Sequence, residues 1–189
     1  MSMDLRAAYD LSLRIKAELA PFCEQIEVVG SIRRARPHVN DIDIVVLPKP
    51  GAREALLARA TARTTVISSG PDIAMLRLKS GAQLDLYFAR GREPDLLDTQ
   101  PSNWGSIVLC RTGSKAHNIF LAQRAQEMGL KWETMRGIVV AEAGQRGSGP
   151  SGQRSALDLP VGKVIASETE EEIFSALNLE WIPPVCRER

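Results

Sequence analysis

The chain has 189 residues, which allows one domain or two small ones, and 44% of them are hydrophobic, enough to bury an ordinary core. The formal net charge is +1, so the chain lacks the global basic field typical of proteins that bind nucleic acid non-specifically. Three cysteines, Cys23, Cys110 and Cys186, have no C-x-x-C spacing, which argues against a zinc site or a disulfide framework.

The sequence also indicates the cellular compartment in which the protein acts. No apolar run approaches the roughly 20 residues that span a bilayer, so we expect no membrane partner. The N-terminus carries charges throughout and shows no secretory leader. We expect a cytoplasmic protein in a reducing, intracellular compartment, with a nucleoid-associated or a viral protein as alternatives.

The first half of the chain alternates helical and extended patterns. Residues 3–19 carry an apolar stripe at helical spacing that ends before Pro21. A short buried strand at 26–29 enters a Gly-Ser turn, and a loop at 36–40 precedes a strand at 41–47. We then expect a helix at 52–62, a strand at 64–68, and a hairpin formed by residues 73–78 and 82–88.

The strand at 41–47 places two carboxylates on one face. Apolar Ile42 and Ile44 alternate with Asp41 and Asp43, and a strand sends alternate side chains to opposite faces. Two close carboxylates resist ionising together unless a cation lies between them. Carboxylate oxygens suit Mg²⁺, which commonly also binds substrate phosphates. The spacing therefore predicts a Mg²⁺ site on this strand, although D-x-D is also common on solvent-exposed strands.

Groups that bind phosphate lie just upstream of this strand. Gly30 and Ser31 follow an apolar run and offer a tight turn, free backbone N–H groups and a hydroxyl. Arg33 and Arg34 add charge with bidentate geometry. Together with the aspartates, these residues predict a site for a metal-bound triphosphate.

The second half begins with a polar connection at residues 90–102. A segment at 104–110 leads into a turn at Gly113, and a helix at 115–128 can be capped by Ser114 and stopped by Gly129. Two short strands are expected within 131–140, a mobile loop at 144–154 and a strand at 161–166. A capping box at Thr169 opens a last helix that ends near Leu177.

Several of these motifs resemble one family. Gly30-Ser31-x-Arg33-Arg34 followed by Asp41-x-Asp43 resembles the signature of the nucleotidyltransferase superfamily. Three further segments resemble family X DNA polymerases, the polymerase beta group: Leu84-Asp85-Leu86, Thr112-Gly113-Ser114-Lys115-x-His117-Asn118, and the run from Thr169 to Phe174. The resemblance implies an α+β fold: a palm at residues 1–100 with a mixed sheet and helices on one face, then a small α/β thumb at 101–189. It would be a minimal palm-plus-thumb form, without the N-terminal lyase and duplex-gripping segments.

The resemblance also implies a reaction. A family X enzyme transfers a nucleotide from a dNTP to a primer 3′-hydroxyl, here as short gap-filling repair. Asp41, Asp43 and Asp85 would hold two Mg²⁺ ions, which Mn²⁺ can replace. Gly30, Ser31, Arg34 and the backbone of Asn40 would bind the triphosphate. Arg33 would face away and pack or pair structurally. The sugar and base would contact Cys110, Arg111, Gly113, Ser114 and Asn118, with Asn118 reaching the minor-groove edge of the base.

The implied partners are a nucleoside triphosphate, a DNA primer-template or gapped DNA, and a protein that supplies the missing duplex grip to a monomer. Three positions depart from the family pattern. Cys110-Arg111 replaces an aromatic pair that helps exclude a 2′-hydroxyl, Gln83 replaces a common arginine, and Ala122 replaces an arginine that checks the template. Loss of the template contact, together with the missing duplex grip, implies low fidelity, weak template dependence or a different acceptor.

Two other classes of function remain. One is a nucleotidyltransferase that is template-independent or directed at a small molecule or a protein. The other is a non-catalytic nucleic-acid-binding module, against which the three intact aspartates argue.

Overall fold

The structure is a computed structural model that describes residues 2–92, 100–142 and 159–188. The chain divides into two compact units: residues 1–90 with Pro184–Cys186, and residues 91–183 with 187–189. Each unit is described by itself. The predicted loop at 144–154 lies outside the described residues, and the functional division into a palm of 1–100 and a thumb of 101–189 stays a prediction.

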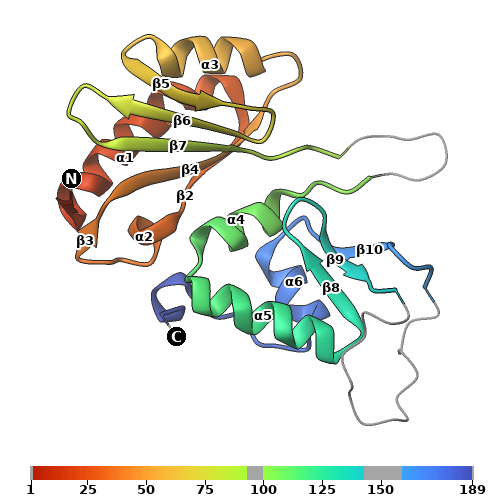
Figure 1. Cartoon of the computed structure of the whole chain (residues 1–189). Coiled ribbons are helices and arrows are strands. Elements are labelled where there is room, and N and C mark those ends of the chain that lie inside the picture. Colours follow the sequence, from red (N-terminus) through yellow and green to blue (C-terminus); the bar gives the residue numbers. More distant parts are fainter. Residues whose placement is uncertain (1, 93–99, 143–158, 189) are drawn as a thin grey trace. The chain divides into compact units, whose positions relative to one another are not determined.

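The first unit is built on a five-stranded sheet with the order β2-β4-β7-β6-β5 (Figure 1). Its strands are β2 (Cys23–Val28), β4 (Asp41–Pro48), β5 (Thr64–Ser69), β6 (Ile73–Leu78) and β7 (Gln83–Phe88). β4 and β7 are parallel, while the other neighbours are antiparallel. The sheet is therefore mixed, as predicted, and β4 and β7 are both interior strands.

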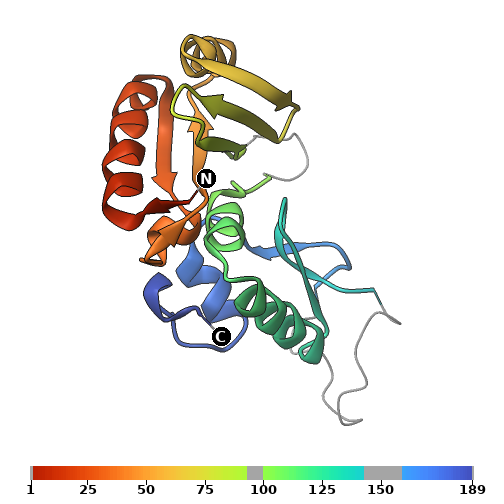
Figure 2. The same cartoon turned by 60° about the vertical axis from the view of Figure 1, so that its left-hand side comes forward.

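Two helices cover one face of this sheet. Helices α1 (Leu5–Leu19) and α3 (Arg53–Thr61) pack their apolar side chains on Ile42, Ile44 and the matching residues of β7 and β6. Figure 2 shows α1 along one side of the sheet. Because Ile42 and Ile44 face the helices, the alternate positions of β4 face away from them. The face of β4 that points away from α1 and α3 is thus the face of Asp41 and Asp43.

Two local predictions in this unit were wrong. Residues 36–40 were expected to be a loop, but β3 (His38–Val39) pairs with β1 (Met3–Asp4), which takes the place of the first residues of the predicted helix at 3–19. Gly30-Ser31 was expected to form a tight phosphate-binding turn, but in the structure Gly30 begins the four-residue helix α2 (Gly30–Arg33). Such short pairings depend on contacts between distant segments and leave no periodic pattern. A 3₁₀ turn, Ala20–Phe22, follows α1.

The second unit packs helices α4 (Trp104–Thr112), α5 (Lys115–Glu127) and α6 (Glu170–Ala176) with a three-stranded antiparallel sheet of order β10-β9-β8. The strands are β8 (Leu130–Glu133), β9 (Gly137–Val140) and β10 (Val164–Ala166). Its core contains Leu109, Leu121, Ile138 and Phe174, among others. A second 3₁₀ turn, Pro184–Cys186, lies near the C-terminus.

The predicted caps of this unit are confirmed. Ser114 Oγ accepts a hydrogen bond from His117 N at 3.3 Å, and Thr169 Oγ1 accepts one from Glu172 N at 3.1 Å. Asn178 adopts the left-handed conformation with φ of 53°. The sequence predicted no element for α4, because this helix is buried on most sides and a helix without a polar face has no clear periodicity.

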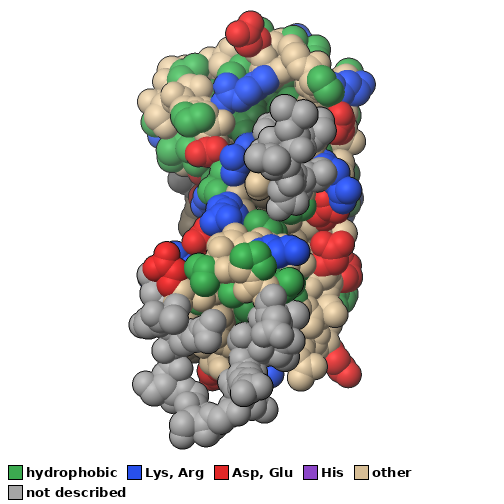
Figure 3. Space-filling model, turned by 90° about the vertical axis from the view of Figure 1, so that its right-hand side faces the viewer, with side chains coloured by type: hydrophobic (Ala, Val, Ile, Leu, Met, Phe, Trp, Pro, Cys, Tyr) green, Lys and Arg blue, Asp and Glu red, His purple; other side chains and the backbone are tan. Residues whose placement is uncertain are grey.

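No described helix is long and apolar enough to cross a membrane. Acidic and basic side chains are interspersed over the molecular face shown in Figure 3, in keeping with the net charge of +1. Any nucleic-acid surface must therefore come from a local cluster of cations.

Candidate active site

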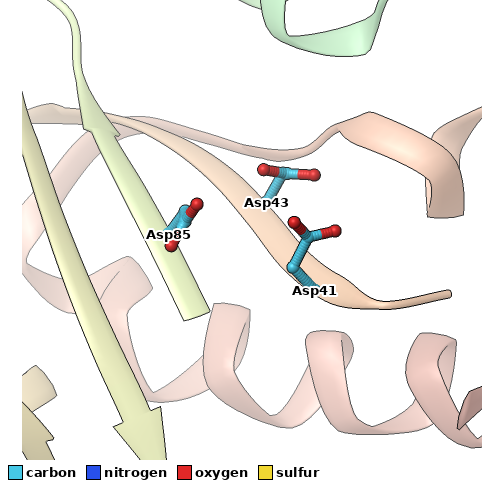
Figure 4. A group of neighbouring side chains, drawn as sticks. All are labelled: Asp41, Asp43 and Asp85. Carbon is cyan, nitrogen blue, oxygen red and sulfur yellow. The ribbon is translucent and has the colours of Figure 1, made fainter. Parts of the chain in front are cut away.

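Three aspartates converge on the face of the first unit's sheet that is opposite α1 and α3. The parallel pairing of β4 and β7 places Asp43 beside Asp85 and Asp41 beside Gln83. One carboxylate oxygen of each aspartate lies within 4.8 Å of the others (Figure 4). Asp85 is only 6% exposed, whereas Asp41 and Asp43 are half-buried. The structure thus brings together the three residues that the sequence predicted as metal ligands.

This donor set fits a hard divalent cation. Three carboxylates offer oxygen ligands only, which is the preference of Mg²⁺ and Mn²⁺. The repulsion among like charges at this separation also favours a cation between them. The arrangement can therefore hold divalent metal and bring it to a bound phosphate.

Two side chains of β7 donate hydrogen bonds to these carboxylates. Gln83 Nε2 donates to Asp85 Oδ1 at 2.9 Å. Tyr87 Oη lies 3.2 Å from Asp43 Oδ1 and 3.5 Å from Asp85 Oδ2. All three β7 residues share one face because they are two positions apart. The sequence pattern indicated this shared face, but the approach of Tyr87 to Asp43 depends on the pairing of β7 with β4.

Gly30 lies directly against Asp43. Its φ is +64°, a left-handed conformation that favours glycine, and an added Cβ would overlap the Asp43 carboxyl group, lying 2.8 Å from Cγ. The neighbouring Val29 N donates to Asp43 O at 2.9 Å. The Gly30 turn therefore packs directly on β4, and only glycine fits at this position.

The other predicted phosphate-binding residues surround this turn. Ser31 Oγ is buried and has no hydrogen-bond partner in the described part of the chain, so it is an orphaned polar atom beside the aspartates' strand. Arg33 Nε lies 3.9 Å from Glu27 Oε1, which confirms the expected structural pairing of Arg33. Arg34 follows α2 directly, and Asn40 is exposed immediately before β4.

Arg77 shares the sheet face and the strand ends of the aspartates. Strand pairing places Gln83 beside Arg77 and Arg77 beside Thr65, so a row runs across the sheet from Asp41 through Gln83 and Arg77 to Thr65. Since strands lie about 4.8 Å apart, Arg77 is roughly 10 Å from Asp41 across the sheet.

Arg77 lines a pocket of about 200 Å³ together with Arg63 and Lys79, and no acidic residue lines it. Within residues 2–92, 100–142 and 159–188, none of these three cations forms an ion pair with a carboxylate. We call Arg63, Arg77 and Lys79 the basic row. The sequence did not indicate it, because it forms only when β5, β6 and β7 are aligned.

The chain is similar in sequence to known proteins. Residues 107–188 match the family model "DNA polymerase beta thumb". The chain is 25% identical over 185 residues, 96% of its length, to the "DNA polymerase/3'-5' exonuclease PolX" of Bacillus subtilis. It spans 28% of the length of that relative.

Solved structures show the same fold. The chain superposes along its whole length on the ternary gap complex of Leishmania infantum polymerase beta, with a TM-score of 0.73, 15% identity and 71% of that chain covered. For the ternary P/T complex of the same polymerase, the TM-score is 0.70, the identity 16% and the coverage 77%. The chain is family X polymerase-like.

In the second unit, the predicted nucleotide-contacting residues meet at the junction of α4 and α5. Asn118 Nδ2 donates to Cys110 O at 2.8 Å and lies 3.8 Å from Cys110 Sγ. Asn118 Oδ1 is buried and without a hydrogen-bond partner among the residues described. Ser114 N donates to Arg187 O at 3.2 Å. The structure therefore brings Cys110, Ser114 and Asn118 together, while Gly113 links the two helices and Arg111 lies in the last turn of α4.

Proposed function

We propose that the chain is a DNA-directed DNA polymerase of the family X type, which fills short gaps by transferring a nucleotide from a dNTP to a primer 3′-hydroxyl. The observation that carries this proposal is the convergence of Asp41, Asp43 and Asp85 on one sheet face beside the Gly30 turn. A structural role does not explain three carboxylates whose oxygens lie within 4.8 Å of one another.

In the proposed reaction, the primer O3′ forms a bond to the α-phosphorus, the bond from that phosphorus to the leaving oxygen breaks, and pyrophosphate departs. Two Mg²⁺ ions, or Mn²⁺ in their place, supply charge stabilisation for the attacking and leaving oxygens. Asp41 and Asp43 would bind both ions, while Asp85 would bind one of them and accept the proton of the 3′-hydroxyl. The remaining contribution of the chain is positioning and charge neutralisation.

The triphosphate would lie on the Gly30 turn. There the orphaned Ser31 Oγ can donate its proton to a phosphate oxygen. Arg34 and the backbone N–H of Asn40 would add to this contact. For the thumb residues Cys110, Arg111, Gly113, Ser114 and Asn118, contact with the sugar and base follows from the family resemblance.

The proposed macromolecular partner is DNA with a primer terminus or a gap. The basic row supports it, because Arg77 lies on the aspartates' sheet face and shares a pocket with Arg63 and Lys79, and three such cations suit the phosphates of a strand whose end reaches the metal site. The Leishmania polymerase beta structures that share the fold are ternary complexes, one of them with gapped DNA. We also propose that the protein is a cytoplasmic monomer.

The test is primer extension on a gapped duplex, an open template-primer and a bare single strand, with Mg²⁺ or Mn²⁺ and with each dNTP and rNTP separately. We expect addition of the complementary nucleotide, which Asp85→Asn reduces by about 10³-fold or more. Equal extension by wild type and Asp85→Asn would overturn the proposal.

The other outcomes separate the alternative functions. Addition that ignores the template would indicate a terminal transferase. No addition to any DNA, with the triphosphate still bound, would indicate a small-molecule or protein acceptor. Comparison of dNTP with rNTP incorporation tests whether Cys110-Arg111 tolerates a 2′-hydroxyl.

A further inference from the structure

Tyr87 has no role in the reaction described above, yet its hydroxyl lies between two of the three aspartates. The side chain is 8% exposed and belongs to an interior strand, where its ring is held by packing. Tyr87 Oη is 3.2 Å from Asp43 Oδ1 and 3.5 Å from Asp85 Oδ2. A phenol hydroxyl donates one proton, which two nearby acceptors can share.

We propose that Tyr87 is a positioning residue of the metal site: its hydroxyl holds Asp43 and Asp85 in the arrangement that binds divalent metal. The proposal rests on the proposed function, because it assumes that the three aspartates bind metal. It adds a residue that does not itself bind metal or substrate.

The physical reason is the repulsion among the carboxylates. Three anionic groups whose oxygens lie within 4.8 Å of one another tend to rotate apart when no cation is bound. The hydroxyl proton of Tyr87, which Asp43 and Asp85 share as hydrogen-bond acceptors, opposes that rotation. Gln83 Nε2 binds the other oxygen of Asp85 at 2.9 Å, so Asp85 is fixed from two sides.

Metal binding does not require these hydrogen bonds to break. A carboxylate oxygen has two lone pairs and can accept a hydrogen bond while it binds a metal. The ligands therefore reach the bound arrangement in advance, and less free energy is spent on ordering them when the metal arrives. Partners of this kind typically change metal affinity by about 10- to 100-fold.

Tyr87→Phe tests this role because it keeps the ring and removes only the hydroxyl. The matched control is Tyr9→Phe, which makes the same change on α1, where Tyr9 is 49% exposed. Mn²⁺ binding is measured by titration calorimetry or electron paramagnetic resonance on protein without nucleotide or DNA, and Mg²⁺ binding by competition.

We expect Tyr87→Phe to weaken Mn²⁺ binding by about tenfold and Mg²⁺ binding by more, because Mg²⁺ requires a nearly ideal octahedral geometry. Tyr9→Phe should bind both metals as the wild type does. Thermal unfolding of metal-free Tyr87→Phe checks that the variant is folded. In primer extension, the loss should diminish at high Mg²⁺ concentration, since the defect is in metal affinity rather than in chemistry.

The two proposals fail in different ways. A Tyr87→Phe variant that binds Mn²⁺ within a factor of about two of the wild type would overturn the positioning role, whatever the extension assay shows. If the wild type extends no primer but Tyr87→Phe still weakens Mn²⁺ binding, the polymerase proposal fails and the role of Tyr87 stands.

Discussion

Among the described residues, each unit has one almost fully buried carboxylate, and the surroundings of the two differ. Asp85 in the first unit is 6% exposed and Glu170 in the second is 5% exposed. Glu170 Oε1 lies 2.7 Å from Nη1 of the fully buried Arg187, whose Nε also donates to Ile182 O at 2.7 Å. Asp85 instead lies beside two further carboxylates and accepts hydrogen bonds from an amide and a phenol.

The difference indicates that the Glu170 carboxylate stabilises the fold, whereas the Asp85 carboxylate belongs to a binding site. A buried carboxylate with an arginine partner is costly to disrupt, because the remaining partner is left buried and unpaired. A carboxylate within a like-charged cluster costs stability until a cation binds. Such clusters mark functional sites. Neutralising the two carboxylates should therefore change stability in opposite directions.

The largest predicted effect is on the stability of the second unit. Glu170→Gln should lower its free energy of unfolding by about 3–5 kcal/mol, because Arg187 loses its charged partner. All three tryptophans, Trp104, Trp132 and Trp181, lie in this unit, so tryptophan fluorescence during urea unfolding reports on it specifically.

Asp85→Asn should leave the first unit as stable as in the wild type or more stable in the absence of metal, as measured by far-UV circular dichroism. The double variant Glu170→Gln/Arg187→Met should regain part of the loss, because no unpaired charge remains. If Asp85→Asn lowers the stability of the first unit while Glu170→Gln leaves that of the second unit unchanged, the assignment of the two carboxylates is wrong.

The second prediction concerns the turn that packs on the metal strand. Gly30→Ala should weaken Mn²⁺ binding by about tenfold or more, because its Cβ would displace the Asp43 carboxyl group. Gly81→Ala is the control: Gly81 also has a positive φ, of +86°, but nothing lies within 4 Å of its added Cβ. Both variants pay the backbone strain of about 1 kcal/mol, so only the difference between them reports on the contact with Asp43. Equal metal binding by both variants would show that the Gly30 turn does not hold Asp43.

The third prediction concerns the basic row. Arg77→Gln, Arg63→Gln and Lys79→Gln should each weaken binding to a primer-template. Each should also reduce the slope of log affinity against log salt by about 1 if that residue neutralises one phosphate. The control is Arg59→Gln, which removes one positive charge from α3 but breaks the ion pair with Glu18, 2.8 Å long. Fluorescence anisotropy at several salt concentrations provides the measurement. If Arg59→Gln weakens binding equally, the effect comes from the net charge of the protein and not from phosphate contacts of the basic row.

How much the sequence predicted depends on the distance between the interacting residues. Asp41 and Asp43 were predicted to share a face, because the two-residue period of a strand is visible in the sequence. The pairing of β4 with β7 was not visible, so the approach of Tyr87 to Asp43 and the alignment of Arg77 with Gln83 could not be inferred. Asp85 was assigned to the site only through the family resemblance.

The second unit shows the same limit. The capping box at Thr169 was found from four consecutive residues, yet Glu170 within it binds Arg187, 17 positions later, and no local pattern signals such a pair. The burial of α4 removed the polar face that would have marked it as a helix. Short-range chemistry was therefore predictable, and the contacts that fix buried charges were not.

The smallest predicted effect is a pH dependence of the second unit's stability. The Arg92 side chain, hydrogen-bonded to Glu168 at 2.8–3.2 Å, holds the pKa of that carboxyl below its usual value, and the hydrogen bond from Ser102 N adds to the shift. Because the folded pKa is lowered, the contribution to stability is present above the unfolded pKa and is lost as the pH falls through the folded one.

Urea unfolding followed by tryptophan fluorescence between about pH 6 and about pH 3 measures this dependence. Arg92→Gln should flatten it slightly, because the exposed Arg92 side chain is screened by solvent. Arg92 and Lys163 line one pocket of about 260 Å³. Lys163→Gln removes the same charge from this pocket, but Lys163 donates no hydrogen bond to Glu168, so it should leave the slope nearly unchanged. If both variants flatten the slope equally, the shift comes from the general field of the pocket rather than from the Arg92–Glu168 contact.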